Sequence, residues 1–379
     1  MAVEIIPGDC RDVLPTLDAG SVHCCVTSPP YFGLRDYNAA NQIGLEQTPN
    51  EFIEQMVAVF REVRRVLRDD GTLWLNLGDS YAGSGKGGNP ADSRHQKQRT
   101  NRGSVAPVGN SARQAAVTNA TRNVRSAAIK PKDLIGIPWE VALALRADGW
   151  WLRSAIVWAK PNGMPGSQED RCTSSYEMIF MLSKSSTYWS DFDAIKTPPR
   201  ESSLIRTAQD VQSQAGSHRA NGGAKTNGTM RAVGVLSGSP HGRHSLGDNV
   251  PPKERRSDKQ RGHSRQHAGF NDRWDAMEKA EQVARPAMMR DVWFVSPASF
   301  TGAHYAVMPN EIARRCILAG CPEGGTVLDP FGGAGTTGLV ADRLQRNAIL
   351  TEINPDNVQI ARDRIDADRS DMLNAMEAA

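Results

Sequence analysis

The sequence lacks the features of membrane and exported proteins. No part of its 379 residues approaches the roughly 18 consecutive apolar residues that span a bilayer. Residues 1–10, MAVEIIPGDC, lack the basic segment and apolar core of a signal peptide. None of the six cysteines belongs to a C-x-x-C pair, so we expect reduced thiols and no metal site. These absences predict a cytoplasmic protein.

Two common enzyme motifs are also missing. GSGKGG at 83–88 lacks the G-K-[ST] ending of a phosphate-binding loop, and no H-E-x-x-H occurs. The length and the 39% of hydrophobic residues suffice for one large α/β domain with insertions or for two modest domains. The chemistry must therefore be sought in less common patterns.

Positive charge is unevenly distributed in a chain whose formal net charge is only +3. Residues 82–130 hold nine Lys or Arg against Asp92 alone, and residues 194–290 hold 17 basic and 9 acidic residues. Both segments are too poor in large apolar residues to offset the entropy of ordering, so we expect them to be largely irregular. Their charge is typical of segments that face a polyanion, with solvated surface loops as the alternative.

Between the basic segments, apolar runs and helical periodicity alternate. The repeat at 51–71 predicts a helix that stops at Gly71, and further helices are expected at 137–149, 309–320, 335–346 and 355–369. Strands are expected at 4–10, 21–30, 72–79, 150–160, 175–185, 325–331 and 347–353. The alternation predicts an α/β fold with a doubly wound, mainly parallel sheet, which binds ligands at the carboxyl ends of its strands.

A glycine-rich loop follows one of these strand ends, in LDPFGGAGTTG at 328–338. Gly333, Gly335 and Gly338 have the spacing G-x-G-x-x-G, which lets a backbone approach a ligand closely at a helix N-terminus. Asp329 could hold an ammonium group, and Glu352, at the end of the next strand, could accept both hydroxyls of a ribose. S-adenosylmethionine fits this set, although the loop alone also suits a dinucleotide or a purely packing role.

A second strand end carries TSPPY at 27–31, where two prolines fix two φ angles and remove two amide donors. The hydroxyl of Ser28 and the carbonyl of Pro29 could accept both hydrogens of an exocyclic amine. The ring of Tyr31 could stack on a base that has been flipped out of a duplex. The alternative is a corner that only ends a strand.

These motifs resemble those of the DNA methyltransferases that modify N4 of cytosine or N6 of adenine. The resemblance is to the group in which the catalytic motif precedes the cofactor loop along the chain. TSPPY matches the catalytic motif, DPFGGAGTTG the cofactor loop, PGDC the adenine-contacting turn, and HYAVMPNEIARRCI the cofactor-tail motif. Residues 156–185 look like the segment flanking the base pocket. The similarity covers about 1–81, 131–193 and 291–365, and implies a Rossmann-like methyltransferase sheet with S-adenosylmethionine as cofactor.

The resemblance also implies roles for individual residues. Ser28, Pro29, Pro30 and Tyr31 would form the catalytic corner. The cofactor-binding residues would be Asp9 and Cys10 at the adenine, Glu352 at the ribose, and Asp329, Phe331, Gly333, Gly335, Thr336 and Thr337 around the methionine part. His304 and Ala306 match the tail motif, although Tyr305 stands where the family usually has proline.

Base choice follows from one residue. Family members that act on adenine usually have Asp or Asn in place of Ser28, so Ser28 favours N4 of cytosine, with N6 of adenine as the alternative. Methylation at C5 of cytosine requires a thiolate nucleophile, and the sequence has no Pro-Cys dipeptide.

The resemblance completes the predicted organisation. We expect the catalytic half at 1–81, a basic loop at 82–130, a continuation at 131–193, a target-recognition insertion at 194–290 and the cofactor-binding half at 291–379. Expected partners are double-stranded DNA and a second copy of the chain, in a bacterial restriction-modification or phage setting. Two rivals are a nicotinamide-dependent oxidoreductase, which leaves TSPPY unexplained, and a non-catalytic DNA-binding protein, which needs no amine pocket.

Overall fold

The computed structural model describes residues 1–34, 39, 41–82, 129–130, 132–163, 169–199, 286–297 and 307–377. The chain divides into two compact units, one formed by Met1–Ile195 with Met289–Ala379 and the other by Lys196–Met288. The elements described below all belong to the first unit. Most of the two predicted basic segments, 82–130 and 194–290, lies outside the described residues.

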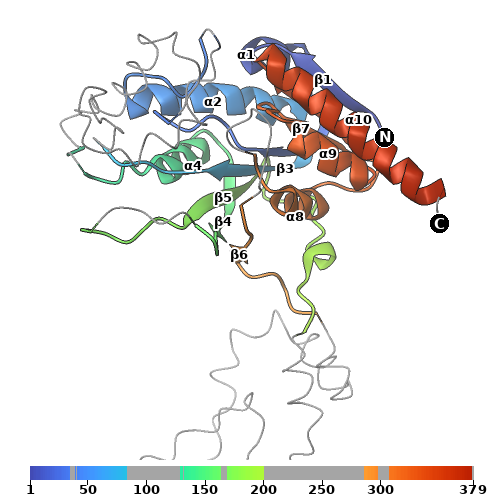
Figure 1. The fold of residues 1–379 in the computed structure, drawn as a ribbon. Helices are drawn as coiled ribbons and strands as arrows, with labels where there is room; N and C mark the ends of the chain where they lie inside the picture. Colours follow the sequence, from blue (N-terminus) through green and yellow to red (C-terminus); the bar gives the residue numbers. More distant parts are fainter. Residues whose placement is uncertain are drawn as a thin grey trace, which may run out of the picture. The chain divides into compact units, whose positions relative to one another are not determined.

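The core of the first unit is an eight-stranded sheet with the order β1-β8-β7-β2-β3-β5-β4-β6 (Figure 1). Strand β5 is antiparallel to both its neighbours, and all other described pairs are parallel. The prediction of a mainly parallel, doubly wound sheet is therefore confirmed. The strands are β1 (Val3–Pro7), β2 (Val22–Thr27), β3 (Leu67–Leu77), β4 (Trp151–Ala159), β5 (Tyr176–Ser183), β6 (Val292–Phe294), β7 (Thr326–Asp329) and β8 (Asn347–Glu352).

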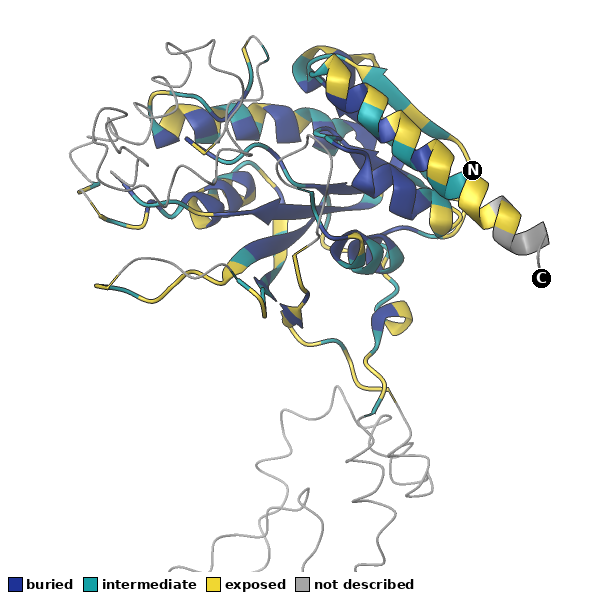
Figure 2. Cartoon of the chain, viewed as in Figure 1, coloured by how far each residue is buried: buried dark blue, intermediate teal, exposed yellow. Residues whose placement is uncertain are grey.

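Helices cover both faces of the sheet (Figures 1 and 2). One face packs against α1 (Cys10–Val13), α2 (Pro49–Val66) and α4 (Ile137–Ala147). The other packs against α8 (Asn310–Gly320), α9 (Thr336–Arg343) and α10 (Pro355–Glu377). The adjacent cysteines of the central strand β2 show how the alternation of side chains feeds two cores, because Cys24 is buried in one cluster and Cys25 in the other.

Several elements differ from the sequence prediction in their bounds or were not predicted. The helix predicted to reach Gly71 ends at Val66, because Leu67 is extended (φ −65°, ψ 142°) and pairs with Val22 at the start of β3. The apolar side chain of Leu67 fits a helix face and a buried strand equally well, which is why periodicity alone misplaced it. Strand β6 was not predicted, and α10 continues past residue 369 to Glu377.

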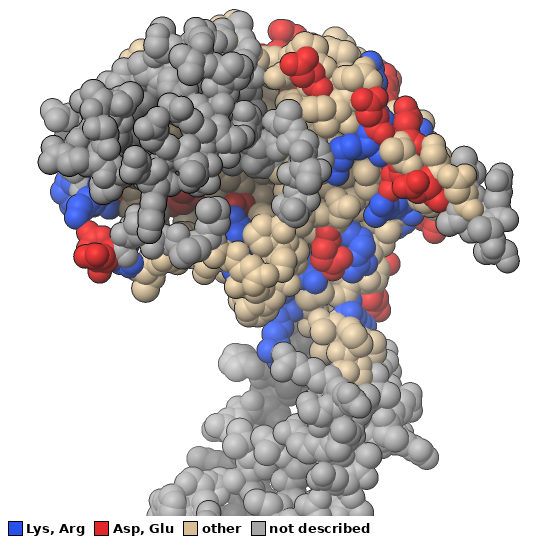
Figure 3. Space-filling model, in the orientation of Figure 1, with Lys and Arg blue, Asp and Glu red and all other residues tan. Residues whose placement is uncertain are grey.

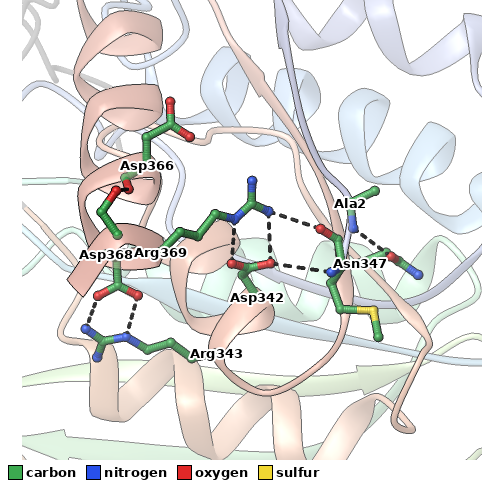
Figure 4. A network of polar contacts seen from close by, with 9 residues as sticks. Ala2, Asp342, Arg343, Asn347, Asp366, Asp368 and Arg369 are labelled. Atoms are coloured by element: carbon green, nitrogen blue, oxygen red, sulfur yellow. Dashed lines mark hydrogen bonds and ion pairs between the residues drawn. The ribbon is translucent and has the colours of Figure 1, made fainter. Parts of the chain in front are cut away.

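The C-terminal helix is tied to the rest of the sheet by ion pairs (Figure 4). Arg369 on α10 donates to both carboxylate oxygens of Asp342 on α9, at 2.8 and 2.9 Å, and Arg343 pairs with Asp368. The amide of Ala2 donates to Asn347 Oδ1 at 3.0 Å. These partly exposed contacts contribute little energy individually, and β1 is held beside β8 by their parallel pairing from Val3 to Pro7.

On the surface shown in Figure 3, acidic and basic side chains of the described residues are interspersed. Within the described ranges no helix is both long enough and apolar enough to cross a membrane.

Candidate active site

The strand ends of the first unit surround a cavity of about 400 Å³ at the carboxyl edge of the parallel strands. This is within the range of small-molecule sites. Most of the predicted site residues line it, namely Asp9, Cys10, Ser28, Pro29, Pro30, Tyr31, Asp329, Phe331, Gly333, Thr336, Thr337 and Glu352. Gly335 does not line it. His304 and Ala306 lie outside the described residues.

The turn after β1 places Asp9 and Cys10 at one end of the cavity. Asp9 caps α1 by accepting the amide of Arg11 at 2.9 Å, and it also pairs with the guanidinium of Arg11. Burial acts to raise the pKa of Asp9, but the hydrogen bonds and charge of Arg11 outweigh it and hold this pKa below its usual value. Burial raises the pKa of the Cys10 thiol to about 12, so Cys10 contributes a neutral side chain.

Asp329 ends β7 and is only 4% exposed. Its Oδ1 accepts from the hydroxyl of Thr27 at 2.6 Å and from the amide of Phe331 at 3.1 Å, while its Oδ2 accepts from the hydroxyl of Thr337 at 2.7 Å. Burial, partly offset by these donors, raises the pKa of Asp329 to about 6. The result is a rigid carboxylate in the cavity wall that would gain from a cationic partner.

The glycine-rich loop that follows Asp329 uses its glycines for different purposes. Gly333 lines the cavity with φ of +51°, a conformation that favours glycine. Gly335 has φ of +78°, and a Cβ there would lie 2.8 Å from the Cβ of Ala361 on α10. Gly335 is therefore required by helix packing, and its predicted contact with a cofactor stays a prediction.

Glu352 ends β8 and is 8% exposed. Its Oε2 accepts from the amide of Gly333 at 2.8 Å, and its Oε1 accepts from the amide of Asn354 at 2.8 Å and from Asn357 Nδ2 at 3.2 Å. These donors occupy three of about four lone-pair positions of the carboxylate. Glu352 thus holds the glycine-rich loop in place and keeps one acceptor position on Oε2 for a ligand hydroxyl.

The TSPPY corner follows β2 and also lines the cavity. The ring of Tyr31 lies against the backbone of Gly78, where a Cβ would approach Tyr31 Cε2 to 2.4 Å. Gly44, at φ of +103°, leaves room for Pro30 in the same way, since a Cβ there would lie 3.2 Å from the Cβ of Pro30. The corner is thus clamped between two glycines that the sequence analysis did not single out.

The cavity is also lined by residues that the sequence analysis did not name, among them Asn76 near the end of β3, Lys160 after β4 and Glu177 near the start of β5. The carboxylate of Glu177 accepts from the Tyr31 hydroxyl at 2.6 Å and from Asn76 Nδ2 at 3.1 Å, and it forms an ion pair with Lys160. Because β5 is antiparallel to its neighbours, its first residues reach the edge where the parallel strands end. A charged residue at the start of an apolar strand was the available signal.

Comparisons with known proteins agree on one kind of enzyme. The sequence profile of the N6/N4 methyltransferase family, described as DNA methylase, matches residues 22–363. Type II methyltransferase M.SmaI of Serratia marcescens is 34% identical over 362 residues, covering 96% of this chain and 90% of that protein. Type II methyltransferase M.Cfr9I of Citrobacter freundii is 36% identical over 369 residues, covering 97% and 89%.

A solved structure has the same fold. The cytosine-N4-specific PvuII DNA methyltransferase superposes with a TM-score of 0.52 at 14% identity, covering 99% of this chain and 93% of that one. At this identity the likeness concerns the fold alone, and it supports the Rossmann-like methyltransferase sheet.

Proposed function

The chain belongs to the N6/N4 DNA methylase family, and from this premise we propose that it is a Type II DNA methyltransferase specific for N4 of cytosine. The methyl group comes from S-adenosylmethionine, and the target is a base flipped out of duplex DNA. The observation that carries the proposal is one cavity lined by two sets of residues. Rigid carboxylates suited to the cofactor form one set, and the Ser28–Tyr31 corner forms the other.

The residues assigned to the cofactor have the chemistry needed to bind S-adenosylmethionine. Asp329 offers a desolvated carboxylate to the ammonium of an amino-acid tail, and Glu352 offers its remaining acceptor position to a ribose hydroxyl. Cys10 supplies a neutral wall for an adenine ring next to Asp9. When bound, the cofactor supplies an electrophilic methyl group on a sulfonium.

The Ser28–Tyr31 corner fits an exocyclic amine. Ser28 Oγ and the Pro29 carbonyl accept the two amine hydrogens, which draws the nitrogen lone pair out of conjugation with the ring. The nitrogen then bonds to the methyl carbon as the carbon–sulfur bond breaks, and one amine proton is lost to solvent. The protein contributes positioning and polarisation and needs no strong base.

Ser28 is also the reason for favouring cytosine. A serine hydroxyl is a weaker acceptor than the carboxylate or amide that adenine-specific members of the family usually place at this position. The amine of cytosine would be activated by the hydroxyl together with the Pro29 carbonyl. Adenine N6 is the competing product, and the choice rests on Ser28.

Duplex DNA would be held by the basic segments, and base recognition is assigned to residues 194–290, whose Arg, His and Asn side chains suit guanine and adenine edges. The division of the chain into catalytic half, loop, continuation, recognition insertion and cofactor half remains a prediction. Pairing of two copies of the chain also remains a prediction.

Mass spectrometry of nucleosides tests the proposal directly. DNA is taken from a methylation-free bacterial host that expresses the chain, with the Tyr31→Ala variant as the matched inactive control. New N4-methylcytosine with the intact chain alone supports the proposal. New N6-methyladenine would move the assignment to adenine. If neither methylated nucleoside appears, the proposed function is refuted.

A further inference from the structure

The carboxylate of Glu177, which the proposed methyl transfer does not yet use, lines the cavity beside Tyr31. The side chain of Glu177 is only 15% exposed, and that of its ion-pair partner Lys160 is 22% exposed. The ammonium of Lys160 also lies 4.6 Å from the centre of the Trp158 ring. A charge pair this far from solvent is costly to assemble, so its geometry calls for a physical role.

The contacts of Glu177 determine where the Tyr31 hydroxyl points. That hydroxyl has one hydrogen, and two of its contacts are to oxygens that can only accept, Glu177 Oε2 at 2.6 Å and Asn76 Oδ1 at 3.3 Å. The shorter distance and the negative charge of the carboxylate direct the hydrogen to Glu177. Asn76 is held in a fixed orientation, since its Nδ2 donates to Glu177 and to the carbonyl of Met178, both at 3.1 Å.

The direction of this hydrogen bond is passed on to Ser28. Its Oγ lies 3.4 Å from the Tyr31 hydroxyl oxygen, and either atom could donate if the two stood alone. Because the Tyr31 hydrogen is committed to Glu177, the tyrosine oxygen offers Ser28 only lone pairs. Ser28 then donates toward Tyr31 and keeps its own lone pairs for the cavity. The contact is long, so Ser28 can still turn toward an incoming amine.

We infer that Glu177 is a positioning residue that orients the Glu177–Tyr31–Ser28 hydrogen-bond chain so that Ser28 acts as an acceptor toward the target amine. This inference rests on the proposed amine methylation. Lys160 balances the charge of Glu177 inside the cavity through their ion pair. Glu177 acts through Tyr31 and Ser28 and makes no contact of its own with the amine.

A double-mutant cycle separates this role from a direct one. Glu177→Gln keeps the size of the side chain and removes its charge. Either the amide nitrogen or the amide oxygen of the glutamine can then face Tyr31. Tyr31→Phe keeps the ring against Gly78 and removes the hydroxyl. Turnover on duplex DNA, the KM for DNA and the Kd for S-adenosylmethionine are measured for both single variants and the double variant. Glu4→Gln, on the exposed part of β1, is the matched control.

Each single variant is expected to lower kcat by about 10- to 100-fold, the range for loss of a charge-assisted hydrogen bond. The KM for DNA and the cofactor Kd should stay within about twofold, because neither binding surface changes. The double variant should be no slower than the slower single variant, since both changes interrupt the same Glu177–Tyr31–Ser28 hydrogen-bond chain. Glu4→Gln should behave as the unmodified chain.

Other outcomes would overturn the inference. Multiplicative losses in the double variant would mean that Glu177 acts independently of the tyrosine hydroxyl, and an unchanged kcat in Glu177→Gln would mean that it has no role. If Glu177→Gln does not fold, Tyr31→Phe alone decides, because normal turnover without the tyrosine hydroxyl would exclude the Glu177–Tyr31–Ser28 hydrogen-bond chain. An unmodified protein that methylates no DNA base would instead refute the proposed function, which distinguishes the two failures.

Discussion

Replacing Asp329 by asparagine tests whether the buried charge of Asp329 lowers the free energy of unfolding while it serves cofactor binding. Asp329 is 4% exposed, and its carboxylate receives hydrogen bonds from Thr27, Thr337 and the amide of Phe331. These three donors do not compensate fully for burial, so its pKa is raised from 3.8 to about 6. Asparagine has nearly the same shape and no charge. Both threonine hydroxyls can rotate to accept from an amide nitrogen.

The sign and size follow from proton linkage. An acid whose pKa is higher in the folded than in the unfolded chain stabilises the fold in its protonated form. That contribution is fully present below pH 3.8 and is lost as the pH rises through about 6. A shift of this size corresponds to about 3 kcal/mol in total, of which roughly 1.5 kcal/mol appears between pH 8 and pH 5.

The assay is urea unfolding of the unmodified chain and of Asp329→Asn at pH 5 and pH 8, without cofactor. The variant should gain relative stability between pH 5 and pH 8 by roughly 1.5 kcal/mol, because only the unmodified chain must bury a charge at pH 8. Comparing the two pH values cancels any packing difference of asparagine. A difference in unfolding free energy that is the same at both pH values would refute the reasoning.

The same substitution should carry a cost in cofactor binding. A bound ammonium group stabilises the ionised form of Asp329, so binding below pH 6 must release a proton from the unmodified chain. We expect the affinity for S-adenosylmethionine to fall as the pH drops below 6 in the unmodified chain. In Asp329→Asn it should be weak and nearly independent of pH. Calorimetry in buffers of different ionisation enthalpy measures the released proton directly.

Four further substitutions separate catalysis, corner geometry and packing. Tyr31→Ala or Pro29→Ala should abolish methyl transfer while calorimetry still shows cofactor binding, because neither residue is among those assigned to the cofactor. Gly78→Ala places a Cβ 2.4 Å from Tyr31 Cε2, so it should displace the ring and lower kcat at an unchanged cofactor Kd. Gly335→Ala, at φ of +78° and against α10, should lower the unfolding free energy by about 1–3 kcal/mol, measured by urea unfolding.

The part of the site that the sequence predicted is the part on parallel strands. Asp9, Ser28, Asp329 and Glu352 each follow or end an apolar run, and the rule that such ends meet at one edge brought them together. Glu177 was not predicted as a site residue because the apolar pattern of a strand does not indicate the direction in which the strand runs. SYEMIFMLSKS reads as a strand either way, and only its antiparallel pairing with β3 and β4 puts its first residues at the cavity.

Spacing alone also could not divide the glycines by role. Gly333 and Gly335 stand in one G-x-G-x-x-G pattern, yet Gly333 faces the cavity and Gly335 faces α10. The cause is Ala361, whose nearness depends on how α10 packs back across α9 and β1. Long-range packing of this kind leaves no local signal in the sequence. The end of α2 was misplaced for a related reason, since Leu67 is buried whether it continues the helix or begins β3.

The order of the strands explains why methyl donor and acceptor should meet where they do. Strands β7 and β2 are neighbours in the sheet, yet the chain runs from β7 through α9 to β8 on one side and from β2 through α2 to β3 on the other, which makes this pair the topological switch point. Thr27 crosses that boundary by donating to Asp329 at 2.6 Å, and the next residue in the chain is Ser28. A single hydrogen bond thus links the carboxylate assigned to the cofactor to the residue that precedes the hydroxyl assigned to the amine. The reacting atoms can be aligned by the sheet itself before either ligand binds.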